Sequence, residues 1–205
     1  MTGTERFDRE AATWDAEERR VLQAKGISEA IVSRCGLPAG LDVLDFGCGT
    51  GLVALALAPL VRSVTGADTS RGMLDVFERK ARERGVEGVR SVLLPAGAPP
   101  ALPERFDLVV SSMALHHVPE LLPLFAWFAA HLRPGGRVAL ADLDREDGTF
   151  HDDGAGVVHL GFDRGPFAAL LEAAGFVDVA LETATVTRKG ERSYPIFLAT
   201  GRTPG

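Results

Sequence analysis

The stretch Val43-Leu-Asp-Phe-Gly-Cys-Gly-Thr-Gly51 decides the fold, because an apolar strand pattern runs into three alternating glycines and then into the alanine-rich apolar stretch 52–60. This order predicts a strand, a tight turn and a helix. The glycines let the backbone take positive φ angles and let a ligand approach without a Cβ in the way. The start of the helix adds unpaired backbone N–H groups. We expect a nucleotide-like cofactor to bind at this turn.

Strands and helices alternate along the middle of the chain, which predicts an α/β protein whose parallel sheet is wound with helices on both faces. Strands are expected at 41–46, 63–68, 89–94, 106–112 and 136–142, and helices near 52–60, 70–85, 119–132 and 165–175. The segment Arg133-Pro-Gly-Gly136 is expected to form the turn before the fifth strand. Two further β-type runs, 177–186 and 194–200, predict a late antiparallel hairpin.

The spacing of the three glycines bears on which cofactor binds. The dinucleotide fingerprint G-x-G-x-x-G requires a third glycine at position 52, which is Leu52 in this chain. Asp45, two residues before the first glycine, suits a cofactor with a positive amino group and would repel a pyrophosphate. The segment resembles the first motif of class I S-adenosylmethionine-dependent methyltransferases, acidic-x-G-x-G-x-G, in particular the small-molecule enzymes of types 11 and 12.

This resemblance covers most of the chain and implies both fold and cofactor. The implied fold is a Rossmann-like, doubly wound, mainly parallel seven-stranded sheet with a C-terminal antiparallel hairpin, and the implied cofactor is S-adenosyl-L-methionine. Residues 1–205 would form a single methyltransferase domain, with an N-terminal helical cap at 1–36, a Rossmann-like core at 37–205 and an acceptor-side loop at 143–164. In the family, a segment similar to Phe7-Asp-Arg-Glu-Ala-Ala-Thr-Trp-Asp15 closes over the cofactor.

Asp68 ends the second predicted strand, close to the distance at which an acidic residue meets ribose hydroxyls. The alternative is that it caps the helix beginning near Ser70. After the third strand the family often has an acidic residue that holds the adenine amino group, whereas this chain has Pro95-Ala-Gly-Ala98. Adenine recognition therefore stays unassigned. The expected cofactor-binding residues are Asp45, Gly47, Cys48, Gly49, Gly51, Asp68, Thr69, Met73, Gly97, Ala98 and Ser111.

The segment Ser111-Ser-Met-Ala-Leu-His-His-Val-Pro119 follows the fourth strand at its carboxyl end, where open α/β sheets bind their ligands. It resembles the post-strand motif of quinone-biosynthesis methyltransferases, not the Asn-Pro-Pro-Tyr form of enzymes that methylate DNA bases. Ser111 and His116 are expected where cofactor meets acceptor, because an imidazole could take a proton from the acceptor. The alternative is that neither neighbouring histidine transfers a proton, since displacement at a sulfonium needs chiefly alignment and a dry site.

The segment 142–163 is rich in glycines, histidines and acidic residues, and acceptor-binding loops lie at this place in related folds. We expect a mobile lid with His159 or His151 facing the acceptor, and the catalytic candidates are His116 and His159. Five side chains of this segment are of the types that bind divalent metals: Asp142, Asp144, His151, Asp152 and His159. Their spacing matches no standard site, so no metal is expected.

Composition sets the remaining bounds. A chain of 205 residues, 46% of them hydrophobic, can form one domain with a substantial core. A net charge of −6 with dispersed arginines gives no electrostatic footprint for a nucleic acid partner. The sequence has no apolar run of membrane-spanning length and no signal region, so a cytoplasmic protein without membrane insertion is expected.

The expected function is in-line transfer of a methyl group from S-adenosyl-L-methionine to a small-molecule acceptor. Two other classes stay open, a catalytically silent module that binds S-adenosylmethionine and an NAD(P)-dependent oxidoreductase. The early third glycine and Asp45 speak against the oxidoreductase. The sequence does not distinguish oxygen, nitrogen, sulfur or carbon as the methylated atom, and it leaves the oligomeric state open.

Overall fold

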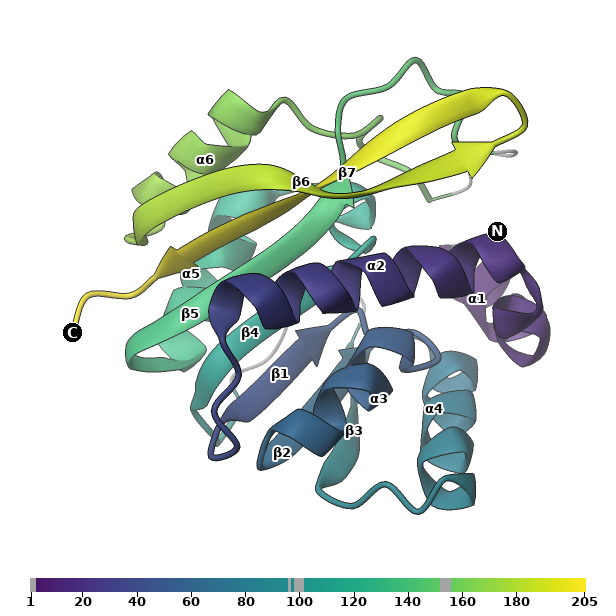
Figure 1. The fold of residues 1–205 in the computed structure, drawn as a ribbon, viewed down its shortest axis with the longest axis horizontal. Coiled ribbons are helices and arrows are strands. Elements are labelled where there is room, and N and C mark those ends of the chain that lie inside the picture. Colours follow the sequence, from purple (N-terminus) through teal and green to yellow (C-terminus); the bar gives the residue numbers. More distant parts are fainter. Residues whose placement is uncertain (1–2, 96, 98–101, 152–155) are drawn as a thin grey trace.

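In the computed structural model, which describes residues 3–95, 97, 102–151 and 156–205, the chain forms a seven-stranded sheet with helices on both faces (Figure 1). The strands are β1 (Asp42–Phe46), β2 (Ser63–Asp68), β3 (Val89–Leu93), β4 (Phe106–Ser112), β5 (Leu132–Leu143), β6 (Val177–Lys189) and β7 (Arg192–Arg202). Their order in the sheet is β3-β2-β1-β4-β5-β7-β6. The first five run parallel, whereas β7 pairs antiparallel with both β5 and β6. The predicted doubly wound sheet with a C-terminal hairpin is confirmed.

The helices divide between the two faces of this sheet. They are α1 (Gly3–Glu10), η1 (Ala11–Ala16), α2 (Glu18–Cys35), α3 (Leu52–Leu57), η2 (Ala58–Leu60), α4 (Arg71–Glu83), η3 (Leu115–His117), α5 (Leu121–His131) and α6 (Arg164–Ala173). Buried residues of α2, α3 and α4 share one hydrophobic core, and those of α5 and α6 share the other. In Figure 1, α2 runs across the front of the sheet, with α3 below it and α5 and α6 behind.

Neighbouring residues of a strand pack into different cores, because successive side chains of a strand point to opposite faces of the sheet. Val43 packs with α2 and α3, while Leu44 packs with the helices of the other face. Val110 packs in the same core as Val43, and Val109 packs in the same core as Leu44. All four side chains are fully buried. A sheet covered on both faces explains why its strands read as continuous apolar runs.

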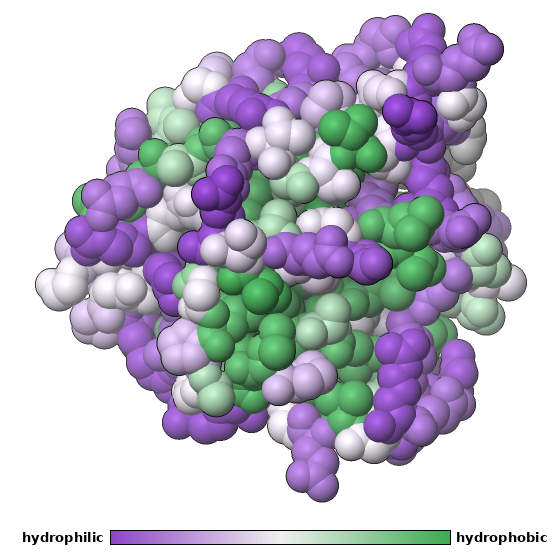
Figure 2. Space-filling model, in the orientation of Figure 1, coloured by the Kyte–Doolittle hydropathy of each residue, from purple (hydrophilic) through white to green (hydrophobic). Residues whose placement is uncertain are grey.

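The surface around α3 carries apolar side chains in an otherwise largely polar face (Figure 2). Leu60 keeps 40% of its surface exposed, while Leu52 and Val61 pack partly buried against the core. None of the helices in the described ranges is long and apolar enough to cross a membrane.

Two elements differ from the sequence-based expectation. The helix expected at 52–60 ends at Leu57 and continues as the 3₁₀ turn η2, because Pro59 enters its first turn and offers no N–H. The turn expected at 133–136 lies inside β5, since Phe106 of β4 pairs with Leu132 and Leu108 pairs with Arg137. The intervening residues form an irregular bulge at the start of the strand.

Candidate active site

A cavity of about 810 Å³ lies at the carboxyl ends of β1, β2 and β4. Its walls come from the glycine turn after β1, from the segments after β2 and β4, and from the N-terminal helices α1, η1 and α2. This is the edge of an open α/β sheet at which ligands bind, because neighbouring connections diverge there. The expected site residues that line the cavity are Asp45, Gly47, Cys48, Gly49, Asp68, Thr69, Met73 and Gly97.

The three glycines of the turn all have positive φ angles, of 70°, 52° and 79° at Gly47, Gly49 and Gly51. A Cβ at Gly51 would lie 2.1 Å from Cδ2 of the buried Phe77, and Gly51 does not line the cavity. A Cβ at Gly49 would meet no atom within 4 Å, and Gly49 does line the cavity. Gly51 is therefore needed for packing, whereas Gly49 leaves open space in which a ligand can approach the backbone.

Asp45 at the end of β1 is 1% exposed, and neither carboxylate oxygen has a hydrogen-bond partner among the described residues. Burial, with the negative charge of Asp68 as the second cause, raises the pKa of Asp45 to about 7, and the nearby Ala54 amide offsets only part of the effect. A buried carboxylate without a partner is costly. This carboxylate is therefore suited to a positively charged ligand group.

Asp68 at the end of β2 holds the glycine turn in shape. Its Oδ2 accepts a hydrogen bond from the Gly49 amide at 2.8 Å, and its Oδ1 accepts one from the Ser70 amide at 2.9 Å. Burial raises its pKa despite these bonds. Ser70 itself caps α4, since its Oγ accepts from the Met73 amide at 3.1 Å. The N-cap of α4 is therefore Ser70, and Asp68 lines the cavity.

The expected adenine side is only partly described. Gly97 and Met73 line the cavity, together with Leu94 at the end of β3, and Met73 is 2% exposed. Ala98 lies outside the described residues. Cys48 is buried in the turn, and burial raises the pKa of its thiol well above the ordinary value, so it is a neutral wall residue.

The post-strand segment presents a different serine and a different histidine from those expected. Ser112 lines the cavity, whereas Ser111 is fully buried and its Oγ donates to the Phe46 carbonyl at 2.9 Å. Similarly, His117 lines the cavity and His116 does not. Ser111 therefore links β4 to β1 in the structure.

His116 is held beneath the cavity wall by Asp142. Its Nδ1 lies 2.8 Å from Asp142 Oδ1, and its backbone amide donates to Oδ2 of the same carboxylate at 3.2 Å. The His116 carbonyl accepts from the amides of Val158 and His159, at 2.9 and 3.1 Å. Against the cost of its complete burial, the charge and hydrogen bond of His116 hold the pKa of Asp142 below its ordinary value. Through His116, the end of β5 is thus linked to Val158 and His159.

His117 is the histidine that faces the cavity. Its Nδ1 lies 2.7 Å from the Gly156 carbonyl oxygen, so Nδ1 carries the proton and Nε2 is left as an acceptor. Burial, and next the charge of His116, lower its pKa to about 4. The imidazole is therefore neutral near pH 7. His159, the other catalytic candidate, does not line the cavity, and its Nε2 lies 2.9 Å from the Val118 carbonyl oxygen.

The N-terminal segment covers the cavity and contributes aromatic walls. The Phe7 ring meets the Trp14 ring edge to face, with centroids 5.7 Å apart, and meets the His117 ring at 5.2 Å in the same way. The two residues lie in successive helices, because α1 ends at Glu10 and Trp14 lies in η1.

Polar contacts fasten this segment to the glycine turn. The Thr50 Oγ1 donates to Asp15 Oδ1 at 2.6 Å, and the buried Lys80 ammonium contacts both Asp15 Oδ2 at 2.6 Å and the Thr50 carbonyl at 2.8 Å. Asp8 of α1 accepts from Ser70 Oγ at 2.6 Å. Sequence reasoning missed Lys80, although its place one turn after the buried Phe77 on α4 was a usable signal.

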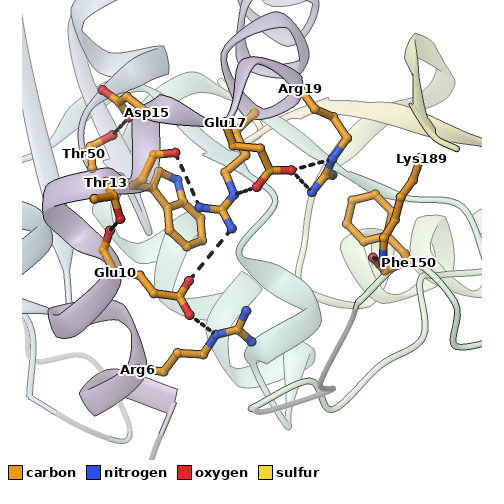
Figure 3. Close-up of polar contacts among 11 residues, drawn as sticks. Arg6, Glu10, Thr13, Asp15, Glu17, Arg19, Thr50, Phe150 and Lys189 are labelled. Atoms are coloured by element: carbon orange, nitrogen blue, oxygen red, sulfur yellow. Dashed lines mark hydrogen bonds and ion pairs between the residues drawn. The ribbon is translucent and has the colours of Figure 1, made fainter.

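Figure 3 shows the outer part of the same segment, where a chain of ion pairs runs from Arg6 through Glu10 to Glu17 and Arg19. The Arg20 guanidinium links the two glutamates and lies 3.6 Å from the centroid of the Trp14 ring. Arginine charges near the cavity are therefore compensated by neighbouring carboxylates.

Metal ligands do not gather in the described part of the chain, where no group of three or more His, Cys, Asp or Glu side chains is placed to hold an ion. Asp152 lies outside the described residues. Asp144 forms an ion pair with Arg164 at 2.7 Å, and Asp142 is occupied by His116.

A glycine turn after β1, an acid at the end of β2 and a cavity shared by both define a nucleoside-type cofactor site of the Rossmann-like class. Comparison with known proteins identifies the family. A family model described as a methyltransferase domain matches residues 43–136. Over 155 residues, the chain is 30% identical to aklanonic acid methyltransferase DauC of Streptomyces sp. strain C5, with 72% of this chain and 67% of that protein covered. The chain belongs to the class I S-adenosylmethionine-dependent methyltransferases, which confirms the predicted family and its cofactor.

Two other similar proteins are also methyltransferases. The chain is 36% identical over 138 residues to nocamycin O-methyltransferase of Saccharothrix syringae, with 65% of this chain and 48% of that protein covered. A solved S-adenosylmethionine-dependent methyltransferase from Clostridium acetobutylicum shares the fold, with a TM-score of 0.72, 17% identity and coverage of 97% of this chain and 99% of that chain. The chain spans about half the length of several of the curated relatives that it matches.

Proposed function

We propose that this protein transfers the methyl group of S-adenosylmethionine to a small-molecule acceptor held in the same cavity. The observation that carries the proposal is the buried carboxylate of Asp45, which has no hydrogen-bond partner among the described residues and lines the same cavity as the open backbone of Gly49. The cavity volume of about 810 Å³ lies in the upper part of the roughly 300–1,000 Å³ typical of small-molecule sites. That volume is large enough for a cofactor of this size.

The residues present suit the parts of this cofactor. Asp45 supplies a negative charge for the amino-acid ammonium group, and Gly49 leaves room for the chain that carries it. Asp68 keeps lone pairs beyond those used by the two backbone amides, and these can accept from ribose hydroxyls. Met73 and Leu94 offer apolar walls for a purine ring.

When bound, S-adenosylmethionine supplies an electrophilic methyl group on a sulfonium. The work of the chain is then to align the acceptor and to exclude water, because such a displacement depends on proximity and a dry site. Phe7 and Trp14 cover the cavity from the N-terminal side. Neutral His117 accepts a hydrogen bond from the acceptor, and even a weak base suffices to take a proton that becomes strongly acidic as the new bond forms.

The two histidines divide the roles that the sequence assigned to one. His117 is the proposed contact to the acceptor, since it lines the cavity. His116 is a positioning residue, because Asp142 holds it from behind and its ring lies 4.1 Å from that of His117, centroid to centroid. The names of relatives such as nocamycin O-methyltransferase favour an oxygen acceptor.

Calorimetric titration of S-adenosylmethionine, S-adenosylhomocysteine and NAD into stripped protein tests the proposal. We expect the first two to bind and NAD to be silent. An acceptor screen followed by S-adenosylhomocysteine release then tests turnover. Binding of NAD alone would contradict the cofactor assignment, and tight cofactor binding without turnover of any acceptor would favour the silent binding module.

A further inference from the structure

The acceptor end of the cavity has an aromatic wall. The rings of His117, Phe7 and Trp14 follow one another edge to face, at centroid distances of 5.2 and 5.7 Å, and all three line the cavity. Ala24 and Met113 add apolar surface nearby in the lining. Walls of this kind favour flat, polarisable ligands, because aromatic rings pair best in edge-to-face or offset contacts.

The charges at this end do not favour an ionic acceptor. Arg20 lies against the Trp14 ring and forms an ion pair with Glu17 at 2.7 Å, while Arg6 pairs with Glu10 at 2.8 Å. A carboxylate ligand would therefore have to compete with glutamates that these arginines already hold. A cationic amine would meet a guanidinium on the ring that could otherwise attract it.

Two of the side chains at this end offer hydrogen-bond acceptors. His117 uses Nδ1 on the Gly156 carbonyl, so its Nε2 accepts, and its pKa of about 4 keeps it neutral. Gln23 of α2 lies one turn beyond Arg20 and lines the cavity, and its buried Oε1 has no partner among the described residues. A buried acceptor without a donor is costly, and rotation of the amide would present it to a ligand.

We propose that the acceptor is an uncharged aromatic hydroxy compound, which presents its reactive hydroxyl to His117 and a second hydrogen-bond donor to Gln23. This inference rests on the proposed function and names its substrate class. Its methylation balances without a further reactant. The oxygen bonds to the methyl carbon, sulfur keeps the electron pair of the broken carbon–sulfur bond, and the hydroxyl proton passes through His117 Nε2 to solvent.

Four matched probes test the substrate class: catechol, benzoate, benzylamine and cyclohexane-1,2-diol. Each is titrated at millimolar concentration into the complex with S-adenosylhomocysteine, and each is offered as acceptor with S-adenosylmethionine. Catechol is expected to bind at least about tenfold more tightly than the others and to be the preferred acceptor. Benzylamine tests the alternative that an ammonium group binds Glu120, which also lines the cavity.

Two variants test the aromatic wall and the Gln23 hydrogen bond separately. Trp14→Leu should weaken catechol binding about fivefold, and Gln23→Leu should raise the KM for catechol about tenfold with S-adenosylhomocysteine affinity unchanged. Leu22→Ala is the matched control, because Leu22 neighbours Gln23 on α2 but is 58% exposed and does not line the cavity.

The outcomes distinguish this inference from the proposed function. Preference for benzoate or benzylamine, or failure of catechol to bind the cofactor complex, would overturn the substrate class while the methyltransferase proposal stands. Failure of S-adenosylmethionine itself to bind would instead overturn the proposed function. An unchanged catechol KM in Gln23→Leu would remove Gln23 from the acceptor site.

Discussion

The carboxylates of Asp45 and Asp68 stand at the ends of neighbouring parallel strands, and the charge of Asp68 adds to burial in raising the pKa of Asp45. The two acids differ in their partners. Asp68 accepts two backbone hydrogen bonds, whereas Asp45 accepts none from the described residues. Asp68 therefore shapes the turn as well as lining the cavity, whereas Asp45 lines the cavity without a partner among the described residues.

The raised pKa of Asp45 makes both stability and cofactor affinity depend on pH. Its pKa is about 7 in the folded protein against 3.8 for the free group, so this site stabilises the fold below pH 3.8 and loses that contribution as pH rises through 7. The contribution is at most roughly 4 kcal/mol. Asp45→Asn should flatten the fall in unfolding free energy between about pH 4 and 7, measured by denaturant titration.

Cofactor binding should show the opposite trend, because an ammonium group favours the ionised carboxylate. S-adenosylmethionine affinity should rise about tenfold per pH unit below pH 7 and level off above it, with proton release visible by calorimetry in two buffers. In Asp45→Asn the affinity should be weak and independent of pH. A wild-type affinity that does not change between pH 6 and 8 would refute this role.

Replacing Asp68 should remove cofactor binding more than it removes stability. Asp68→Asn would lose the proposed charge-assisted acceptor for two ribose hydroxyls, so we expect a rise in Kd on the order of a hundredfold. The unfolding free energy should fall by about 1–3 kcal/mol, because the Gly49 or Ser70 amide loses its partner. Asp75→Asn, an exposed carboxylate on α4, is the control for charge alone. Equal affinity in the two variants would exclude the ribose contact.

Two glycines of the same turn should respond differently to alanine. Gly51→Ala would press a Cβ against the buried Phe77 ring, and we expect a loss of about 2–5 kcal/mol in unfolding free energy from overpacking and left-handed strain. Gly49→Ala should cost only about 1–2 kcal/mol, from strain. Its main effect should be on S-adenosylmethionine affinity. Thermal unfolding and calorimetry on both proteins decide the matter, and a Gly49→Ala protein with normal affinity would contradict a ligand at that point.

Lys80 should control how firmly the N-terminal segment is attached. Lys80→Met breaks the contacts to Asp15 and to the Thr50 carbonyl, at an expected cost of about 1–3 kcal/mol because Asp15 stays partly solvated. Amide hydrogen exchange should accelerate in residues 3–16 and stay unchanged in β1. Lys25→Met, on the exposed surface of α2, is the control. Unaltered exchange at 3–16 would show that other contacts fasten the segment.

The strands and the glycine turn could be predicted because their signals are local in the chain. The identity of the side chain that enters the cavity could not, since adjacent residues point in opposite directions at a strand end. The chain carries two serines and two histidines side by side, and in each pair the second one lines the cavity. The sequence alone offers no way to choose between such neighbours.

The contacts of the N-terminal segment could not be predicted from local sequence patterns either. The Asp15 contact to Lys80 joins residues 65 positions apart, and Arg20 and Gln23 carry no signal of their own in the α2 sequence. Their places depend on how α2 packs over the sheet. Phe7 and Trp14 could be predicted as part of the site because they lie in a segment that resembles one of the family's segments.

The N-terminal segment and the strand ends line different parts of the cavity. The glycine turn and the two strand-end acids line one part of the cavity, and residues between 4 and 24 line another part, which we propose holds the acceptor. Under the proposed function, exchange of that short stretch between related chains should alter which molecule is methylated and leave cofactor affinity unchanged. If so, a change in the covering segment alone would be enough to give the protein a new acceptor, with the sheet unchanged.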